Sequence, residues 1–178
     1  MNISLTRSTL LAVAVFLPVV FAQHGSMPPG TSHEEHMKQM SRNADMKKRG
    51  DAAMGFDQEK VRHHFLLTKQ GGMIEVAANE RADSETRKQI RAHLQLITRD
   101  FTQGLFSSPM QTHAEVPPGV PVLRDRKDQI KYKYEETPNG ARVVIATADR
   151  SARKAIHSFL RYQIREHATG DPEYVGIY

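Results

Sequence analysis

The fold is decided by a unit that occurs twice: HHFLLTKQGGMIEVAANERADSETRKQIRAHLQLITRDF at residues 63–101 and YKYEETPNGARVVIATADRSARKAIHSFLRYQIREH at residues 132–167. One gap of three residues aligns the copies, so that Gly71 falls on Gly140 and Leu94 falls on Leu160. Each copy predicts a strand, a glycine turn, a second strand and a helix. An internal repeat of this kind indicates an architecture, which composition alone does not.

Local patterns agree with the repeat. Apolar residues alternate with polar ones in the strand regions and recur every three or four residues in the helical regions. Asn139-Gly140 favours a tight hairpin, because both residues accept positive φ at low cost. Asp83 and Asp149 precede the two helices and predict N-caps. We therefore expect an α+β fold in which two ββα repeats form a four-stranded antiparallel sheet with two helices packed on one face.

The repeat leaves the packing of its two copies open. The simplest arrangement is one domain with a pseudo-two-fold axis, in which the second face of the sheet exposes Lys131, Lys133 and Glu135 to solvent. The alternative is a pair of layers that face each other in a dimer. Both arrangements use the same secondary structure, so the sequence does not separate them.

Composition divides the chain into four segments. Residues 1–22 predict a secretory signal peptide, because a basic residue precedes a short apolar run and Val20 and Ala22 supply small residues at the −3 and −1 positions. Residues 23–54 are polar and rich in Met and His, which predicts a disordered or loosely helical arm. Residues 55–170 predict a single domain with a proline-rich connector at Leu105–Asp128, and residues 171–178 predict a tail.

The overall composition excludes several classes of function. The chain has 178 residues, a net charge of +5 and no cysteine, so it has no disulfide and no thiolate ligand. No nucleic-acid partner is expected, because no basic stripe is interleaved with stacking aromatics. After the signal peptide no apolar stretch is long enough for a transmembrane segment. No Gly-x-Ser-x-Gly motif indicates a catalytic nucleophile.

The repeat places three histidines opposite aromatic residues of the other copy. His63 falls on Tyr132, His93 falls on Phe159, and His167 falls on Phe101 (an alignment that uses the same single gap). Each histidine can therefore be interpreted as a flat, half-polar core residue. His157 shares a helix face with Arg161 and Arg165, which indicates an exposed basic stripe.

The alternative interpretation is that some of these imidazoles converge on a metal ion. His63 and the helical His93 belong to the same unit, so we expect them to face each other across the layer. Neutral imidazoles bind zinc, copper or iron, and a site needs three or four ligands. Strand alternation turns His64 to the opposite face from His63, and His113 lies in the connector. The predicted metal ligands in the domain are His63, His64, His93 and His113.

The arm carries a second set of candidate ligands. His33, His36, Met37 and Met40 are spaced at i, i+3, i+4 and i+7, which places them on one face of a helix. Thioethers prefer Cu(I) or Ag(I), so the expected ion is copper or silver rather than zinc. The composition of this segment resembles that of the Met/His-rich segments of exported copper- and silver-handling proteins of bacteria. Two alternatives remain: an apolar face that docks on a partner or on the domain, and a linker in which the methionines have no role.

The folded region resembles an uncharacterised family of small exported bacterial proteins. The motifs that carry this resemblance are Met54-Gly55-Phe56-Asp57-Gln58, His63-His64-Phe65, Thr112-His113, Val116-Pro117-Pro118-Gly119-Val120-Pro121, and Phe159–Arg165 through Gly170-Asp171. The resemblance covers most of the chain from Gly55 onward but not the arm. It implies a bacterial envelope origin and carries no activity, substrate or catalytic residue.

Together these observations predict a small soluble protein of the bacterial envelope, periplasmic or secreted, that binds a soft transition metal through the Met/His arm and through a histidine site in the domain. Binding rather than catalysis is expected. The first alternative is a non-catalytic interaction module that binds an envelope protein partner and uses its histidines structurally. The weaker alternative is a metal-dependent enzyme.

Overall fold

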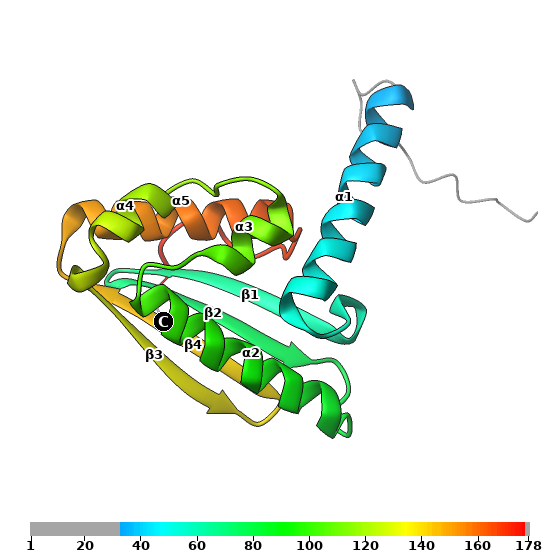
Figure 1. Ribbon diagram of the computed structural model, residues 1–178, viewed down its shortest axis with the longest axis horizontal. Helices are drawn as coiled ribbons and strands as arrows, with labels where there is room; N and C mark the ends of the chain where they lie inside the picture. Colours follow the sequence, from blue (N-terminus) through cyan, green and yellow to red (C-terminus); the bar gives the residue numbers. More distant parts are fainter. Residues whose placement is uncertain (1–32, 177–178) are drawn as a thin grey trace, which may run out of the picture.

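The computed structural model describes residues 33–176. The expected signal peptide, residues 23–32 of the expected arm and the last two residues of the tail lie outside these residues. Figure 1 shows a four-stranded sheet with helices on one face and one further helix that projects away from the domain. The expected α+β class is confirmed.

The sheet has the strand order β1-β2-β4-β3, and every neighbouring pair is antiparallel. Its strands are β1 (Val61–Thr68), β2 (Gly71–Ala78), β3 (Ile130–Thr137) and β4 (Gly140–Thr147). At the centre of the sheet, Ile74 of β2 pairs with Val143 of β4. These two residues are equivalent in the repeat, so a pseudo-two-fold axis passes through this pair and both copies lie in one domain.

The two long helices α2 (Ser84–Thr102) and α5 (Arg150–Glu166) cover one face of the sheet. Their N-caps are as expected, because the Asp83 and Asp149 carboxylates accept hydrogen bonds from the backbone N–H groups of Thr86 and Ala152. Each helix packs chiefly on the strands of the other unit: α2 covers β3 and β4, and α5 covers β1 and β2. The two units are therefore interlocked through one shared core.

The expected connector contains two short helices, α3 (Ser107–His113) and α4 (Val120–Asp125), which close the end of the core. Short 3-10 helices cover Gln58–Lys60 and Lys127–Gln129. The helix α4 packs on α5, and α3 packs on the helix that precedes the domain. The side chains of Phe106 and Leu123 are almost fully buried, so the connector belongs to the core.

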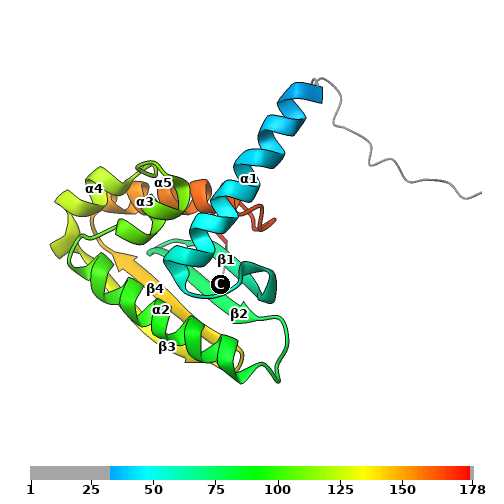
Figure 2. The same ribbon diagram turned by 45° about the vertical axis from the view of Figure 1, so that its right-hand side comes forward.

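The described part of the expected arm is a regular helix, α1 (His33–Met54). Its N-terminal turns project away from the domain, whereas its last turns lie against it (Figures 1 and 2). Arg49 Nε donates to the backbone oxygen of Thr112 over 3.1 Å, and Gln58 Nε2 donates to that of Lys47 over 2.9 Å. Lys47 also forms an ion pair with Glu59. Among residues 33–176, no helix has the length and apolar character that crossing a membrane requires.

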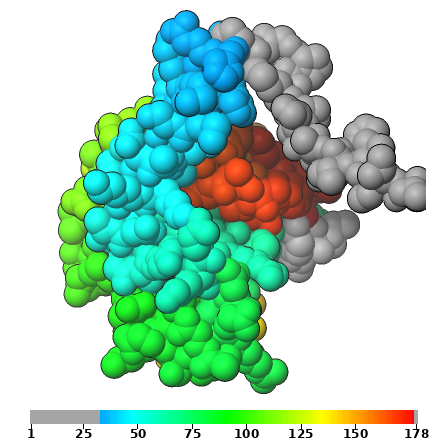
Figure 3. Space-filling model, turned by 90° about the vertical axis from the view of Figure 1, so that its right-hand side faces the viewer, coloured from blue at the N-terminus to red at the C-terminus, as the bar shows by residue number. Residues whose placement is uncertain are grey.

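The chain after α5 covers the outer edge of β1. The Asp171 carboxylate accepts a hydrogen bond from the backbone N–H of Phe65, and the N–H of Gly176 donates to the carbonyl of Leu67. Figure 3 shows this C-terminal region in red beside α1. His157 does not form the expected exposed stripe, because its Nε2 atom lies 3.0 Å from the backbone oxygen of Thr68 and ties α5 to the first hairpin.

Candidate histidine cavity

A small cavity of about 60 Å³ lies between the sheet, α2, α3 and α5. We call it the histidine cavity, because four imidazoles and two further polarisable side chains contribute to its walls: His63, His93, His113, His167, Met54 and Gln163. Aliphatic and aromatic residues form most of the remaining wall. Of the described residues that line the cavity, none carries a formal charge at neutral pH.

Four separate elements bring the imidazoles together. His63 lies on the helix-covered face of β1 and His93 lies on the buried face of α2. His113 is the last residue of α3, and His167 is the C-cap of α5. The cavity therefore exists only when the sheet, both long helices and the connector are packed together.

The ring of His167 lies at the centre of the group. Its centre is 5.2 Å from that of His63, with the two ring planes at 24°, and 5.2 Å from that of His113, with the planes at 86°. The ring of Phe56 connects His63 to His93: its centre lies 6.2 Å from that of His63 and 5.6 Å from that of His93. The four imidazoles thus form a continuous cluster with Phe56, and Phe65 also lies against the rings of His63 and His167.

His63 and His93 line one cavity, as their shared unit suggested, but the packing of the helices differs from what that expectation assumed. The helix covering β1 was expected to belong to the same repeat, whereas α5 of the second repeat covers β1. The ring stacked on His63 is therefore that of His167. His93 shares the cavity and reaches the group through Phe56.

Burial keeps these imidazoles neutral. Desolvation lowers the pKa of His63 and of His93 to about 4, with a smaller contribution at His63 from its histidine neighbours. Desolvation, followed by His63 and His113, lowers the pKa of His167 to about 3. The pKa of His113 is also lowered by burial, against the opposing effect of its hydrogen bond with Gln163. All four therefore present lone pairs at neutral pH.

Several polar atoms of the cluster have no hydrogen-bond partner among residues 33–176. They are His63 Nε2, His113 Nδ1 and Gln163 Nε2, and all three are buried. His113 Nε2 donates to Gln163 Oε1 over 3.0 Å, which leaves the lone pair of His113 on Nδ1. A buried polar atom without a partner costs about 1–3 kcal/mol. Such atoms call for an explanation, and a bound ligand supplies one.

Grooves on the outer surface reach the same imidazoles. His63 and His167 also line a groove of about 400 Å³ beside Met46 of α1. His113 also lines a polar groove of about 360 Å³, together with Glu166. These three rings therefore line both the histidine cavity and the outer grooves.

Of the predicted domain ligands, His64 lies apart from the cavity. Its Nδ1 atom is 2.9 Å from the Asp171 carboxylate, and its side chain is partly exposed. The strand alternation that separates it from His63 also separates it from His93 and His113. The structure thus brings three of the four predicted domain ligands to one cavity.

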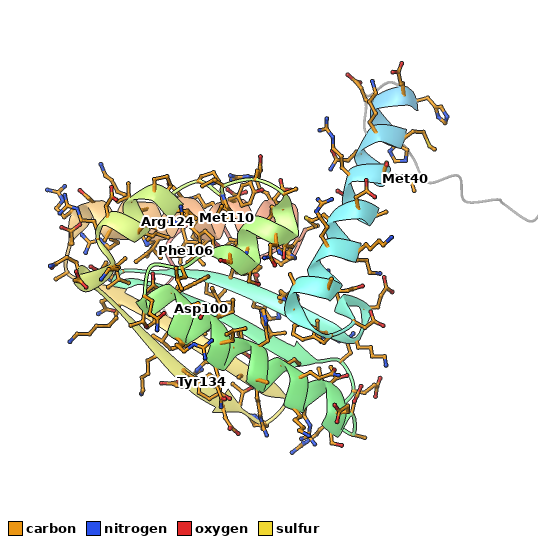
Figure 4. All side chains as sticks on the ribbon, in the orientation of Figure 1. Met40, Asp100, Phe106, Met110, Arg124 and Tyr134 are labelled. Carbon is orange, nitrogen blue, oxygen red and sulfur yellow. The ribbon has the colours of Figure 1, made fainter. Side chains whose placement is uncertain are left out.

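The arm ligands lie on the projecting part of α1. His33, Met37 and Met40 are exposed and His36 is partly exposed, and Figure 4 shows Met40 on the part of the helix that stands away from the domain. Met40 precedes Met54 by fourteen residues in the same helix, which corresponds to about 21 Å. The two sets of candidate ligands are therefore separate sites.

The ring spacing in the cavity is compatible with a shared metal ion. An imidazole nitrogen binds zinc at about 2.0–2.1 Å, which places the ring centre about 3.2 Å from the ion and two such rings about 5 Å apart at a tetrahedral angle. The spacings around His167 match this value. Among residues 33–176, no three His, Asp or Glu side chains already have the arrangement that a bound metal requires. Binding would therefore have to turn the rings.

Besides Met54, two polar residues of the cavity wall were absent from the predicted ligand set. The alignment of His167 with Phe101 favours a core residue over a metal ligand. Gln163 falls on Ile97 in the same alignment, so a buried amide replaces an aliphatic side chain. A polar residue that replaces a core residue in one copy of a repeat is the signal that could have found both.

Comparisons with protein-family models, with curated proteins and with solved structures find no match to this chain.

Proposed function

We propose that this protein binds a soft or borderline transition-metal ion in the histidine cavity. Neutral imidazoles and a thioether are ligands for copper, silver and zinc, and the cavity provides both. The observation that carries the proposal is the presence of buried, unpartnered nitrogens on His63 and His113 beside the ring of His167. Metal coordination would use lone pairs whose burial is otherwise unfavourable.

The exposed face of α1 forms a second, independent set of ligands in this proposal. His33, His36, Met37 and Met40 are accessible to an ion from solvent, whereas the histidine cavity retains an ion away from water. The expected envelope location fits this division, because soft thioether and imidazole ligands suit a compartment in which thiols are oxidised. The protein would act as a sequestering or carrier protein rather than as an enzyme.

The test is anaerobic titration with Cu(I), Ag(I), Cu(II) and Zn(II). The repeat supplies matched variants for the cavity, since His63→Tyr and His167→Phe introduce the aromatic residue that the other copy uses. A variant with His33→Ala, His36→Ala, Met37→Leu and Met40→Leu removes the α1 ligands. We expect two sub-micromolar sites in the wild type, a loss of at least about tenfold in affinity at one of them in each cavity variant, and one retained site in the α1 variant.

If no ion binds more tightly than micromolar, the proposal is wrong and the histidines are core residues of an interaction module. If the cavity variants bind as the wild type does and only the α1 variant loses affinity, the metal site belongs to α1 and the domain is not involved.

A further inference from the structure

The described residues in the walls of the histidine cavity include metal-binding donors but no charged side chain. Its candidate ligands are imidazoles that are neutral at pH 7 and the thioether of Met54. The acidic side chains that the structure associates with the cluster are absent from the described lining: Asp100 acts electrostatically on His93, and Glu115 and Glu166 act on His113, with which they line the outer polar groove. An ion in the cavity would thus be surrounded by neutral donors and hydrocarbon.

We propose that the histidine cavity selects a monovalent soft cation, Cu(I) or Ag(I), over the divalent ions Zn(II) and Cu(II). This inference rests on the proposed function, and it names the class of ion that the cavity takes. The geometry that supports it is a cavity of about 60 Å³ whose described lining residues are all uncharged.

The physical reason is the dependence of desolvation on charge. The Born cost of moving an ion from water into a medium of low dielectric constant rises with the square of its charge, so a divalent ion loses about four times as much hydration energy as a monovalent ion of the same size. All-imidazole zinc sites keep a bound water as a fourth ligand, and other buried divalent ions recover most of this loss from carboxylates or thiolates. The cavity provides neither, whereas neutral imidazole and thioether donors are sufficient for Cu(I).

Gln163 offers a direct test of this argument. Its side chain lines the cavity and lies 3.0 Å from His113 Nε2. The substitution Gln163→Glu keeps the shape of the side chain and places one negative charge in the wall. The matched control is Gln95→Glu, which makes the same change at an exposed position on α2.

The experiment measures Ag(I) and Zn(II) dissociation constants by anaerobic competition, in the background that lacks the four α1 ligands. We expect the parent protein to prefer Ag(I) by at least about 100-fold, and Gln163→Glu to move the ratio toward Zn(II) by at least about tenfold, with no change in Gln95→Glu. Cu(I) is expected to compete with Ag(I) for the same site.

The outcomes separate the two levels of the proposal. Equal affinity for Ag(I) and Zn(II) in the parent protein overturns the charge selection but leaves metal binding in place. Micromolar or weaker affinity for every ion overturns the proposed function itself. If Gln163→Glu does not fold, as judged by circular dichroism, the ratio measured for the parent protein decides the question alone.

Discussion

His167 makes the largest number of imidazole contacts in the core. Its ring lies against those of His63 and His113, and desolvation with these neighbours holds its pKa near 3. In the other copy of the repeat the equivalent residue is Phe101, which is buried among aromatic side chains. An apolar ring therefore fits this kind of position. A histidine there lowers the free energy of unfolding, because its ring nitrogens lose their hydration, unless they bind a hydrogen-bond partner or a ligand.

Burial of these imidazoles predicts a pH dependence for the metal-free protein. In the unfolded chain a histidine protonates near pH 6.5, whereas the folded protein keeps His63 and His93 neutral down to about pH 4 and His167 to about pH 3. The unfolded state thus binds more protons below pH 6.5, and the free energy of unfolding falls as the pH drops from about 6.5 to about 4. Urea unfolding at several pH values, after treatment with a chelator, measures this slope.

The substitution His167→Phe measures the contribution of one histidine to the pH dependence of the free energy of unfolding. It removes a buried imidazole and introduces the residue that the other copy uses, so we expect the pH dependence to weaken by about 1.4 kcal/mol per pH unit. His36→Phe on α1 is the control, because it lies outside the cavity. A slope that is the same in His167→Phe and in the wild type would contradict the assignment.

At the scale of the elements, the repeat predicted the strands, both N-caps and the class of fold, because these depend on residues close in sequence. It did not predict that α2 covers β3 and β4 while α5 covers β1 and β2. Which strands a helix covers depends on packing between units, and no local pattern records it. For this reason the ring stacked on His63 is that of His167, while His93 lies in the wall of the same cavity.

The segment after α5 is predicted to stabilise the edge of the sheet through Asp171. Asp171 is nearly buried and accepts hydrogen bonds from the Phe65 backbone and the Thr169 hydroxyl, in addition to its contact with His64. We expect Asp171→Asn to lower the free energy of unfolding by about 1–3 kcal/mol, because charge-assisted bonds to the edge of β1 are weakened. The control Asp128→Asn removes an exposed ion pair with Lys127, and a change within about 0.5 kcal/mol is expected there. If chemical denaturation gave the same change in the free energy of unfolding for both variants, the contact of Asp171 with β1 would contribute no more than an exposed ion pair.

The close approach of α5 to β2 predicts that Gly72 does not tolerate a larger side chain. A Cβ atom on Gly72 would run into the side chain of Leu160 and the backbone oxygen of Leu66. We expect Gly72→Ala to cost about 1–3 kcal/mol, because α5 must move away from β2. Ala77→Ser lies on the open face of the same strand, and its free energy of unfolding should change by about 0.5 kcal/mol or less. Wild-type stability in Gly72→Ala would mean that α5 moves at little cost.

At the scale of the whole molecule, the candidate site was only partly predictable. Three of its histidines were identified from their positions in the repeat and the connector, because residue type and spacing are visible in the sequence. The cavity itself was not, since it requires α3 in the connector and the last turn of α1, where Met54 completes the wall. The sequence did not indicate α3, nor that α1 is anchored by Arg49 and Lys47.

The histidine cavity lies in the core, whereas the α1 ligands lie on the projecting helix. This difference predicts how metal binding at each site affects the stability of the whole protein. An ion bound as proposed in the histidine cavity would contact residues from β1, α3 and the C-cap of α5 and would be released on unfolding, so it would stabilise the folded state by about 2.7 kcal/mol at a free concentration of 100 Kd. For a domain of this size we expect Tm to rise by on the order of 10 °C with Ag(I). An ion on the exposed face of α1 would not depend on the core and would add little to the stability of the fold.

Thermal unfolding with and without Ag(I) should therefore show the full shift in Tm in the wild type and in the variant without the α1 ligands, and almost none in His63→Tyr or His167→Phe. A shift that disappears with the α1 ligands instead would place the binding that stabilises the protein on α1, against the role of the cavity.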